Sequence, residues 1–210
     1  MKKHHAPEID WQKQWELFAP GFQDGIAQID LAPYSGKNCP PLLLQAGAGF
    51  GDLSHPTTQM MLQLMAPYIK NAQVIDIGCG SGILSLAAAM LGAHSVFGID
   101  IDPQALQHAA QNCKINNLQN PPKFAKQVPS NFFTDRPLII LMNMIFSEQR
   151  QAWQSQQLLH SREAIIIISG ILSSQKNPYL PWTQQLGWSL KQECASEEWA
   201  SFVFSQNAKL

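Results

Sequence analysis

The chain is poor in charged side chains, which make up 14% of its 210 residues, and its formal net charge is −1. Lysine and arginine are scattered, with no basic run beyond Lys2 and Lys3. A surface that binds nucleic acid through its phosphates needs clustered positive charge. The composition therefore gives no indication that the protein binds nucleic acid.

Long apolar runs are also missing. No stretch of about eighteen uncharged apolar residues occurs, the length that a transmembrane helix requires, and residues 1–7 lack the apolar core of a signal peptide. We therefore expect no membrane association and a cytoplasmic location.

Cysteine is scarce, and the four cysteines are far apart in the sequence, with no Cys-x-x-Cys pair. Free thiols are expected in place of disulfides or a zinc site. The adjacent His4 and His5 are interpreted as part of a solvated N-terminal tail, so no metal site is predicted. The cysteines are Cys39, Cys79, Cys113 and Cys194.

What the sequence does contain is a βαβ pattern over residues 74–102. An apolar run that contains Asp76 is followed by a glycine-rich turn and an apolar helix, and a second apolar run ends at Asp100. Gly78, Gly80 and Gly82 allow the backbone to turn tightly and to lie against a ligand. Asp100 follows Gly78 by 22 residues, a suitable distance for a carboxylate that accepts hydrogen bonds from ribose hydroxyls.

The spacing of this turn favours S-adenosylmethionine (SAM) over a dinucleotide. Gly82 follows Gly80 by two residues and not by three, and the acid Asp76 precedes the glycines. A pyrophosphate needs free helix N–H groups, whereas SAM carries an ammonium that a nearby carboxylate can offset. A tight turn with no ligand is the alternative, and it leaves the acid at the second strand end unexplained.

The remaining pattern predicts strands alternating with helices, and hence a mostly parallel sheet covered on both faces. Ligands in such sheets lie beyond the carboxyl ends of the strands, where the glycine-rich turn, Asp100 and Asn143 are expected to converge. The predicted strands are 26–31, 42–44, 122–126, 137–143 and 164–168, with a closing hairpin of 188–194 and 198–204. The predicted helices are 8–18, a helix capped by Ser54 and ending near Ile69, one starting at Asp102, 146–160 and 182–186; residues 33–36 are predicted as a turn. Pro178 and Pro181 are expected to break any helix before Trp182.

Two groups of aromatic and imidazole side chains leave alternatives open. Trp11, Trp15 and Phe18 share one helical face, which favours packing on the main domain over a platform for a peptide or a base. His55 is a candidate general base, but a histidine fixed by packing at the helix start is the favoured interpretation.

The chain resembles the bacterial ribosomal protein L-eleven methyltransferases from about Asp10 to the C-terminus. Phe50-Gly51 followed by His55-Pro56-Thr57-Thr58 is similar to that family's Phe-Gly-(three residues)-His-Pro-Thr-Thr segment. The glycine-rich unit 74–105 matches almost residue for residue, and Asn143-Met144-Ile145 stands where the family has Asn-Ile-Leu. Ser169-Gly170-Ile171-Leu172 and the Glu198-Trp199 hairpin also agree.

This resemblance implies a Rossmann-like class I SAM-dependent methyltransferase with a mostly parallel seven-stranded sheet and an antiparallel C-terminal hairpin. Asn143 would be catalytic, facing the methyl group and the incoming nitrogen. The implied cofactor contacts are Phe50, Thr57, Asp76, Gly78, Cys79, Gly80, Gly82, Asp100, Ile101 and Asn143.

The chain departs from the family at three places. Asp52-Leu53-Ser54 stands where Thr-Gly-Thr is usual, and Phe146-Ser147-Glu148 replaces Ala-x-Pro, so Phe146 is expected to crowd or reshape the acceptor mouth. The family's ferredoxin-like N-terminal domain also has no counterpart before the Trp11/Trp15 helix. We therefore expect a linker-like segment, 1–46, followed by a catalytic domain, 47–210.

The resemblance implies transfer of a methyl group to a lysine or α-amino nitrogen of a protein, with ribosomal protein L-eleven as the suggested partner. Two alternatives stay open. One is a methyltransferase acting on a non-ribosomal protein or a small molecule, and the other is a SAM-binding module without catalysis.

Overall fold

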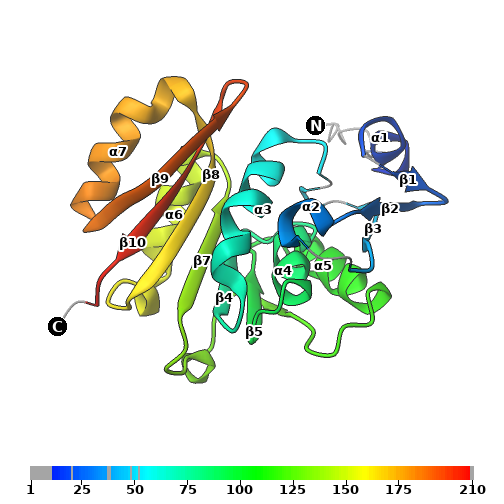
Figure 1. Cartoon of the computed structure of the whole chain (residues 1–210), viewed down its shortest axis with the longest axis horizontal. Coiled ribbons are helices and arrows are strands. Elements are labelled where there is room, and N and C mark those ends of the chain that lie inside the picture. The colour runs from blue at the N-terminus through cyan, green and yellow to red at the C-terminus, as the bar shows by residue number, and fades with distance from the viewer. Residues whose placement is uncertain (1–10, 20, 37–38, 48, 52, 209–210) are drawn as a thin grey trace, which may run out of the picture.

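The computed structural model describes residues 11–19, 21–36, 39–47, 49–51 and 53–208. They form a three-stranded sheet, in the order β1-β2-β3, and a seven-stranded sheet, in the order β6-β5-β4-β7-β8-β10-β9 (Figure 1). The strands are β1 Phe22–Gln23, β2 Ile26–Ile29, β3 Leu42–Gln45, β4 Gln73–Ile77, β5 Ser95–Ile99, β6 Lys123–Ala125, β7 Leu138–Asn143, β8 Ala164–Leu172, β9 Trp188–Ser196 and β10 Trp199–Gln206. The helices are α1 Trp11–Phe18, α2 Ala32–Ser35, α3 Pro56–Ile69, α4 Ile83–Met90, α5 Pro103–Ile115, α6 Phe146–Ser155 and α7 Lys176–Gln185, with short 3-10 helices η1 Ser130–Phe132, η2 Gln157–Leu159 and η3 Ser173–Gln175.

The seven-stranded sheet is parallel from β6 through β8 and antiparallel at β10 and β9. This confirms the predicted mostly parallel sheet with a C-terminal hairpin. The chain fills one half of the sheet with β4, β5 and β6 and then crosses to β7 on the other side of β4. The order of the strands therefore reverses beside β4, and such a switch point is where ligands bind in open α/β sheets.

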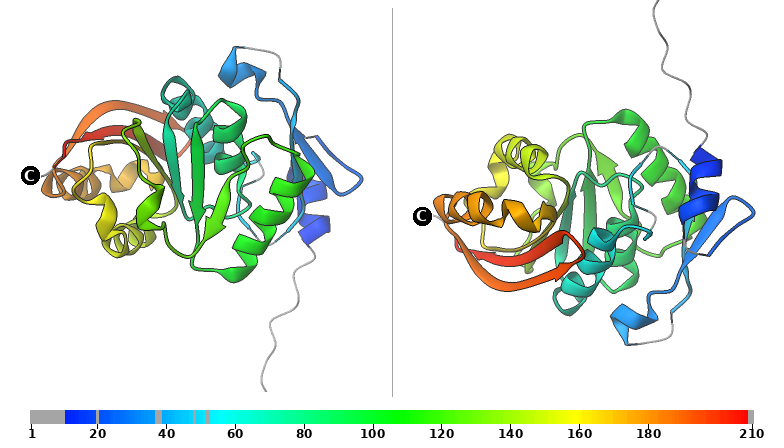
Figure 2. Two further views of the ribbon diagram at one scale, coloured as in Figure 1. Left: turned by 90° about the horizontal axis from the view of Figure 1, so that it is seen from below. Right: turned by 90° about the horizontal axis from the view of Figure 1, so that it is seen from above.

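Alternation along the central strands divides the core into two layers. On β4, Val74 belongs to the layer shared with α3 and α4, whereas Ile75 belongs to the layer that includes Trp153 of α6 and Tyr179 of α7. Figure 2 shows helices on both faces of the sheet. Because both faces are covered, the central strands are buried along almost their whole length and do not alternate between buried and exposed residues.

The small sheet and α1 lie at the opposite end of the molecule from the β9–β10 hairpin (Figures 1 and 2). Trp15 is buried against Phe22 and His108, which confirms the packing interpretation for this ring. The predicted shared face is wrong for Phe18, which is 65% exposed because it ends the helix beyond the buried contact. The side chain of Trp11 and residues 1–10, with His4 and His5, lie outside the described residues.

Several predicted helix boundaries are wrong at their starts or ends. His55, and not Ser54, caps α3, since its side chain accepts a hydrogen bond from Thr57 N. The helix predicted over 146–160 ends at Ser155, and η2 follows. The turn predicted at 33–36 is the short helix α2, which ends with Gly36 at φ 65°.

The C-terminal elements are longer than predicted. Helix α7 begins at Lys176 and contains Pro178 and Pro181, which were expected to break a helix. Pro178 lies in the first turn, where its missing N–H has no intrahelical acceptor, and burial of Tyr179 and Thr183 outweighs the bond lost at Pro181. Strand β8 continues past Ile168 to Leu172 because β10 pairs along it.

All four cysteines are free thiols, as predicted. Within the described residues, none of the helices combines the length and the apolar character that crossing a lipid bilayer requires.

Candidate active site

The carboxyl ends of three strands meet at one level of the sheet. Ile77, the last residue of β4, pairs with Ile99 of β5 on one side and with Met142 of β7 on the other. Gly78 and Asp100 directly follow the first two of these residues, and Asn143 follows the third. The structure thus brings together the three features that were expected from the sequence to converge.

The glycine-rich loop is fixed to the neighbouring strand by its backbone. The N–H groups of Gly78 and Cys79 both donate to Ile99 O, at 2.8 and 3.0 Å. Gly78, Gly80 and Gly82 all have positive φ, at 73°, 54° and 83°, a region that favours glycine. Hydrogen bonds within the protein therefore hold the loop in its turned conformation.

Asp100 bridges this loop and the start of α5. Its Oδ2 accepts from Gly80 N at 3.1 Å, and its Oδ1 accepts from Asp102 N at 3.0 Å. The side chain is half-buried, and each carboxylate oxygen has a second lone pair. Asp100 can therefore accept further hydrogen bonds from ligand hydroxyl groups.

Asp76 lies beneath the loop and is 1% exposed. Ser85 Oγ on α4 donates to its Oδ2 at 2.7 Å. Burial raises the pKa of this carboxyl to about 7, against the opposing effect of the Ser85 hydrogen bonds and with a small contribution from the charge of Asp100. Ionisation of this buried carboxyl therefore costs free energy, and a cation placed nearby would lower that cost.

Cys79 contributes its backbone and not its thiol. The side chain is buried, and burial, with smaller contributions from Asp76 and Asp100, raises the pKa of the thiol well above its usual range. The thiol therefore stays protonated and is unsuited to nucleophilic chemistry.

Asn143 is oriented by helix α3. Its Nδ2 donates to Thr58 Oγ1 at 3.4 Å, and Thr58 is fully buried. With Nδ2 turned toward α3, the carbonyl Oδ1 is the atom of the amide that can accept a hydrogen bond from an incoming amine. The hydroxyl-rich start of α3 thus positions the predicted catalytic residue.

Thr57 and His55 form a compact cap beside the site. His55 Nδ1 lies 2.7 Å from Thr57 Oγ1, and the ring packs between Phe50 and Trp199 at centroid distances of 5.7 and 5.0 Å. These contacts favour the packing interpretation of His55 over a general-base role.

Two of the predicted contact residues present apolar surface at the strand ends. Phe50 is 57% exposed and Ile101 is 89% exposed. Exposed apolar side chains of this size beside a polar loop suit the face of a planar aromatic ligand.

A second contact to the glycine-rich loop was not predicted from the sequence. Ser81 N donates to Phe50 O at 2.9 Å, and Ser81 Oγ donates to Gly51 O at 2.5 Å. A Cβ at Gly80 would lie 2.6 Å from Phe50 O, and one at Gly49 would lie 2.4 Å from the Gly80 carbonyl carbon. Residues 49–51 therefore pack backbone to backbone on the loop, a contact that no local pattern could have predicted.

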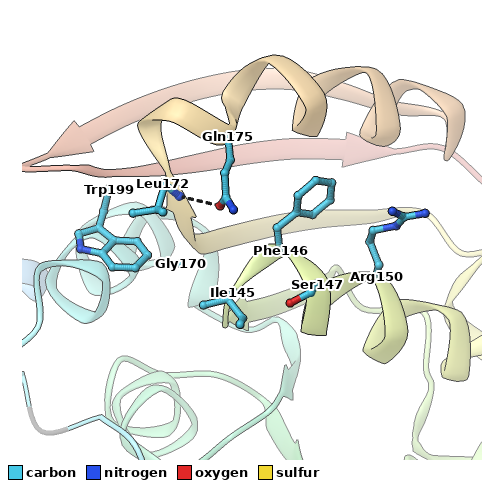
Figure 3. Close-up of a pocket in the computed structure, with 8 residues that line it drawn as sticks. All are labelled: Ile145, Phe146, Ser147, Arg150, Gly170, Leu172, Gln175 and Trp199. Atoms are coloured by element: carbon cyan, nitrogen blue, oxygen red, sulfur yellow. Dashed lines mark hydrogen bonds between the residues drawn. The ribbon is translucent and has the colours of Figure 1, made fainter.

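A cavity of about 390 Å³ opens two residues beyond Asn143 (Figure 3). The ring of Phe146 forms part of its wall and packs against Tyr179 and Trp182 of α7, at 5.0 and 5.5 Å. Phe146 therefore shapes the cavity from the side of α7, whereas Ile145, 48% exposed, is the lining residue nearest Asn143 in the chain. The cavity is lined by Ile145, Phe146, Ser147, Arg150, Gly170, Leu172, Gln175 and Trp199.

In the described ranges of the chain, no group of three or more histidine, cysteine, aspartate or glutamate side chains could hold a metal ion. The site offers a glycine-rich loop, two carboxylates and one amide to a ligand.

The fold matches solved methyltransferase structures. A ribosomal protein L11 methylase from Lactobacillus delbrueckii subsp. bulgaricus superimposes with a TM-score of 0.65 at 23% identity, covering 86% of this chain and 98% of that one. A putative methyltransferase, yhhF, from Escherichia coli gives 0.62 at 20% identity, covering 88% and 100%. At these identities the likeness shows the class I methyltransferase fold.

The sequences of relatives show the family of this chain. A ribosomal protein L11 methyltransferase from Teredinibacter turnerae is 32% identical over 98% of this chain and 69% of its own length. The corresponding protein from Geobacillus thermodenitrificans is 31% identical over 96% of this chain but only 62% of its own length, so the chain spans about two thirds of these relatives. Because residues 2–207 match the family model of ribosomal protein L11 methyltransferase (PrmA), the chain belongs to that family.

Proposed function

We propose that this protein is a SAM-dependent N-methyltransferase that transfers a methyl group to a lysine or α-amino nitrogen of a protein. The observation that carries the proposal is the level at which β4, β5 and β7 end. It places a glycine-rich loop, a half-buried carboxylate and an oriented amide side by side. Membership of the L11 methyltransferase family supports the same chemistry.

The residues present suit SAM. Asp100 would accept hydrogen bonds from the ribose, and Phe50 and Ile101 would flank the adenine. Asp76, buried and reluctant to ionise, would be stabilised by the ammonium of the methionine end, near which Thr57 would also lie. Gly78, Gly80 and Gly82 would let the backbone approach the ligand, and the Cys79 backbone would complete the loop. When bound, SAM supplies an electrophilic methyl group on a sulfonium.

The chain's own part in the reaction is to orient the nitrogen and exclude water. A lysine acceptor must first lose a proton, which costs about 4–5 kcal/mol at neutral pH from a reference pKa near 10.4. The apolar lining beyond Asn143 lowers that cost by desolvating the ammonium. Asn143 Oδ1 would then accept one N–H of the amine and aim its lone pair at the methyl group.

Ribosomal protein L11 is the acceptor named for the relatives, and we propose it as the first substrate to test here. A cytoplasmic location and the absence of direct contact with nucleic acid or membrane are part of the same proposal. The division into a linker-like segment, 1–46, and a catalytic domain, 47–210, is proposed with it.

Calorimetry with SAM and a transfer assay with tritiated SAM test the proposal. Asp100→Ala is expected to weaken SAM binding by about 1–3 kcal/mol, the scale for losing hydrogen bonds to a charged acceptor. Asn143→Ala is expected to slow transfer by about 10- to 100-fold at saturating SAM, beyond any loss of SAM affinity, because the nitrogen is no longer aimed. Asp135→Ala is the matched control, because Asp135 is an exposed acid that precedes β7, at the opposite end of that strand from Asn143.

Three outcomes would decide against parts of this assignment. Failure of the purified wild type to bind SAM would overturn the function altogether. Binding without transfer to any protein or small molecule in a lysate would favour a SAM-binding module. Transfer only to an acceptor other than L11 would keep the chemistry and replace the substrate.

A further inference from the structure

His108 on α5 contacts a part of the chain that its sequence position does not suggest. Its Nδ1 accepts from Gly49 N at 3.0 Å, and its Nε2 lies 2.7 Å from Gln45 O. A backbone N–H can only donate and a backbone carbonyl can only accept, so Nδ1 is unprotonated and Nε2 carries the hydrogen. The structure thus requires the neutral imidazole in one tautomer.

Gly49 belongs to the segment 49–51 that packs on the glycine-rich loop. Through Phe50 O and Gly51 O this segment accepts both the backbone N–H and the hydroxyl of Ser81. Asn112, one turn after His108 on α5, donates to Ser81 O at 2.8 Å. His108 is therefore joined to the loop by contacts from two directions.

We propose that His108 is a positioning residue for SAM binding: its neutral ring holds segment 49–51 against the glycine-rich loop, and protonation releases that segment. A protonated Nδ1 would face the Gly49 N–H with a second donor, so the hydrogen bond could not persist. The proposal rests on the proposed function, because the affinity that changes is the affinity for SAM.

The surroundings of His108 disfavour its charged form. The ring packs in a T-shaped arrangement with Trp15 at a centroid distance of 5.9 Å, a Cβ at Gly47 would lie 2.6 Å from it, and His108 is only 4% exposed. Burial lowers the pKa of His108, partly offset by the hydrogen bond to Gln45 O.

The described groups that contact the ring carry no charge: Trp15 from α1, Gln45 at the end of β3, Gly49, and Asn112 from α5. The titratable side chains on these elements are Lys13 and Glu16, exposed on α1, and Cys113 and Lys114 on α5. Cys113 and Lys114 lie more than one helical turn beyond His108 on α5. Protonation of the His108 ring is therefore the charge change that acts on Gly49.

SAM affinity of the full chain should be measured by calorimetry between pH 8 and pH 5, with the His108 ring and the Gly49 amide followed by NMR. The affinity is expected to fall by about two- to tenfold as His108 protonates, the range for one lost hydrogen bond. The Gly49 amide signal should shift with the same midpoint as the ring. Since Asp76, with a pKa raised to about 7, also titrates in this pH range, the comparison with a variant isolates the contribution of His108.

His108→Gln keeps one donor and one acceptor but does not titrate, so the part of the pH dependence that follows the imidazole should disappear. His160→Gln is the matched control, because His160 also bonds a backbone carbonyl, Trp153 O at 2.8 Å, but on the other side of the sheet. The control should retain the wild-type pH profile.

Each result is decisive. If wild type binds SAM at pH 8 and the affinity stays constant while His108 titrates in the NMR spectrum, the inference is wrong and the proposed function stands. An unchanged pH profile in His108→Gln would also overturn it, even if that variant is less stable, because the wild-type titration is measured independently. Absence of SAM binding at every pH would overturn the proposed function instead.

Discussion

At the scale of single residues, the glycine-rich loop shows that one motif can meet two demands. Gly80 was expected to be small so that SAM could approach. In the structure a side chain there would first meet Phe50 O at 2.6 Å, and φ is 54°. The glycine is thus needed by the fold before any ligand arrives, and a substitution there cannot test ligand binding alone.

Gly80→Ala is therefore expected to destabilise the chain by about 1–3 kcal/mol, the range for strained backbone and a close contact. Gly92→Ala is the matched control, since Gly92 has φ 94° but nothing within 4 Å of the added Cβ. Urea unfolding of both variants separates the two effects. Equal losses would mean that positive φ alone matters and that the contact with Phe50 is unimportant.

Asp76 illustrates a conflict between stability and binding. Its pKa is raised from 3.8 to about 7 by burial, so between pH 4 and 7 the folded chain holds more protons than the unfolded chain. Stability contributed by this group is therefore lost as pH rises through that window.

Asp76→Asn should remove this loss, because the amide stays neutral and its oxygen can still accept from Ser85 Oγ. Denaturant unfolding at pH 4.5 and 8 should show a smaller decline for the variant than for wild type, by up to a few kcal/mol. SAM affinity should fall in the same variant because the charge opposite the ammonium is gone. A variant that loses stability at pH 8 would show that the ionised carboxylate is well accommodated.

At the scale of elements, helix α5 serves as a partner for the free edge of β3. Asn116 pairs with Leu43 through both backbone groups, at 2.9 and 2.7 Å, and Asn112 Oδ1 accepts from Gln45 N at 2.8 Å. His108, Asn112 and Asn116 are spaced by four residues, so they share one face of the helix. This row of polar side chains forms hydrogen bonds with the backbone groups at the edge of β3, which otherwise would need another strand as a partner.

Asn116→Ala is expected to free the edge of β3 and to cost about 1–3 kcal/mol, since two backbone groups of Leu43 lose their partners. Hydrogen exchange of the small sheet should accelerate more than exchange of β4 or β7. Gln111→Ala, exposed on the same helix, is the control for helix propensity. Uniform acceleration across both sheets would contradict a local role for the row.

At the scale of the whole molecule, the length of the chain bears on how an acceptor is recognised. The chain covers 62% of the length of the Geobacillus relative, so an assay of these 210 residues by themselves tests what the matched part of such a protein recognises. The cavity beyond Asn143 is the surface that we propose for contact with the acceptor.

If the unmatched third of a full-length relative binds L11 and so raises its local concentration, purified L11 is expected to be methylated more slowly, and at fewer sites, by these 210 residues than by that relative. Mass spectrometry of L11 after timed incubation measures both quantities. Fusion of a relative's N-terminal region before Asp10 should raise the rate if the cavity accepts L11. Equal rates and site numbers without the fusion would show that this chain recognises L11 unaided.

The sequence alone was sufficient for features that depend on local pattern. Apolar β-branched runs predicted β4, β5, β7 and β8, and the register of neighbouring parallel strands brought Gly78, Asp100 and Asn143 to one edge. The family resemblance rested on the same residues. Periodicity and turn residues act over a few positions, which is why these predictions were confirmed.

The tertiary structure alone decided the contacts between distant segments. Proline signals failed at Pro181 because burial of Tyr179 outweighs a lost backbone bond, and no pattern indicated that residues 49–51 lie on the glycine-rich loop. The role of His108 depends on Gly49, 59 positions away. Hydrogen bonds and close packing across such separations follow from how the layers dock, so they are fixed only once the whole chain has folded.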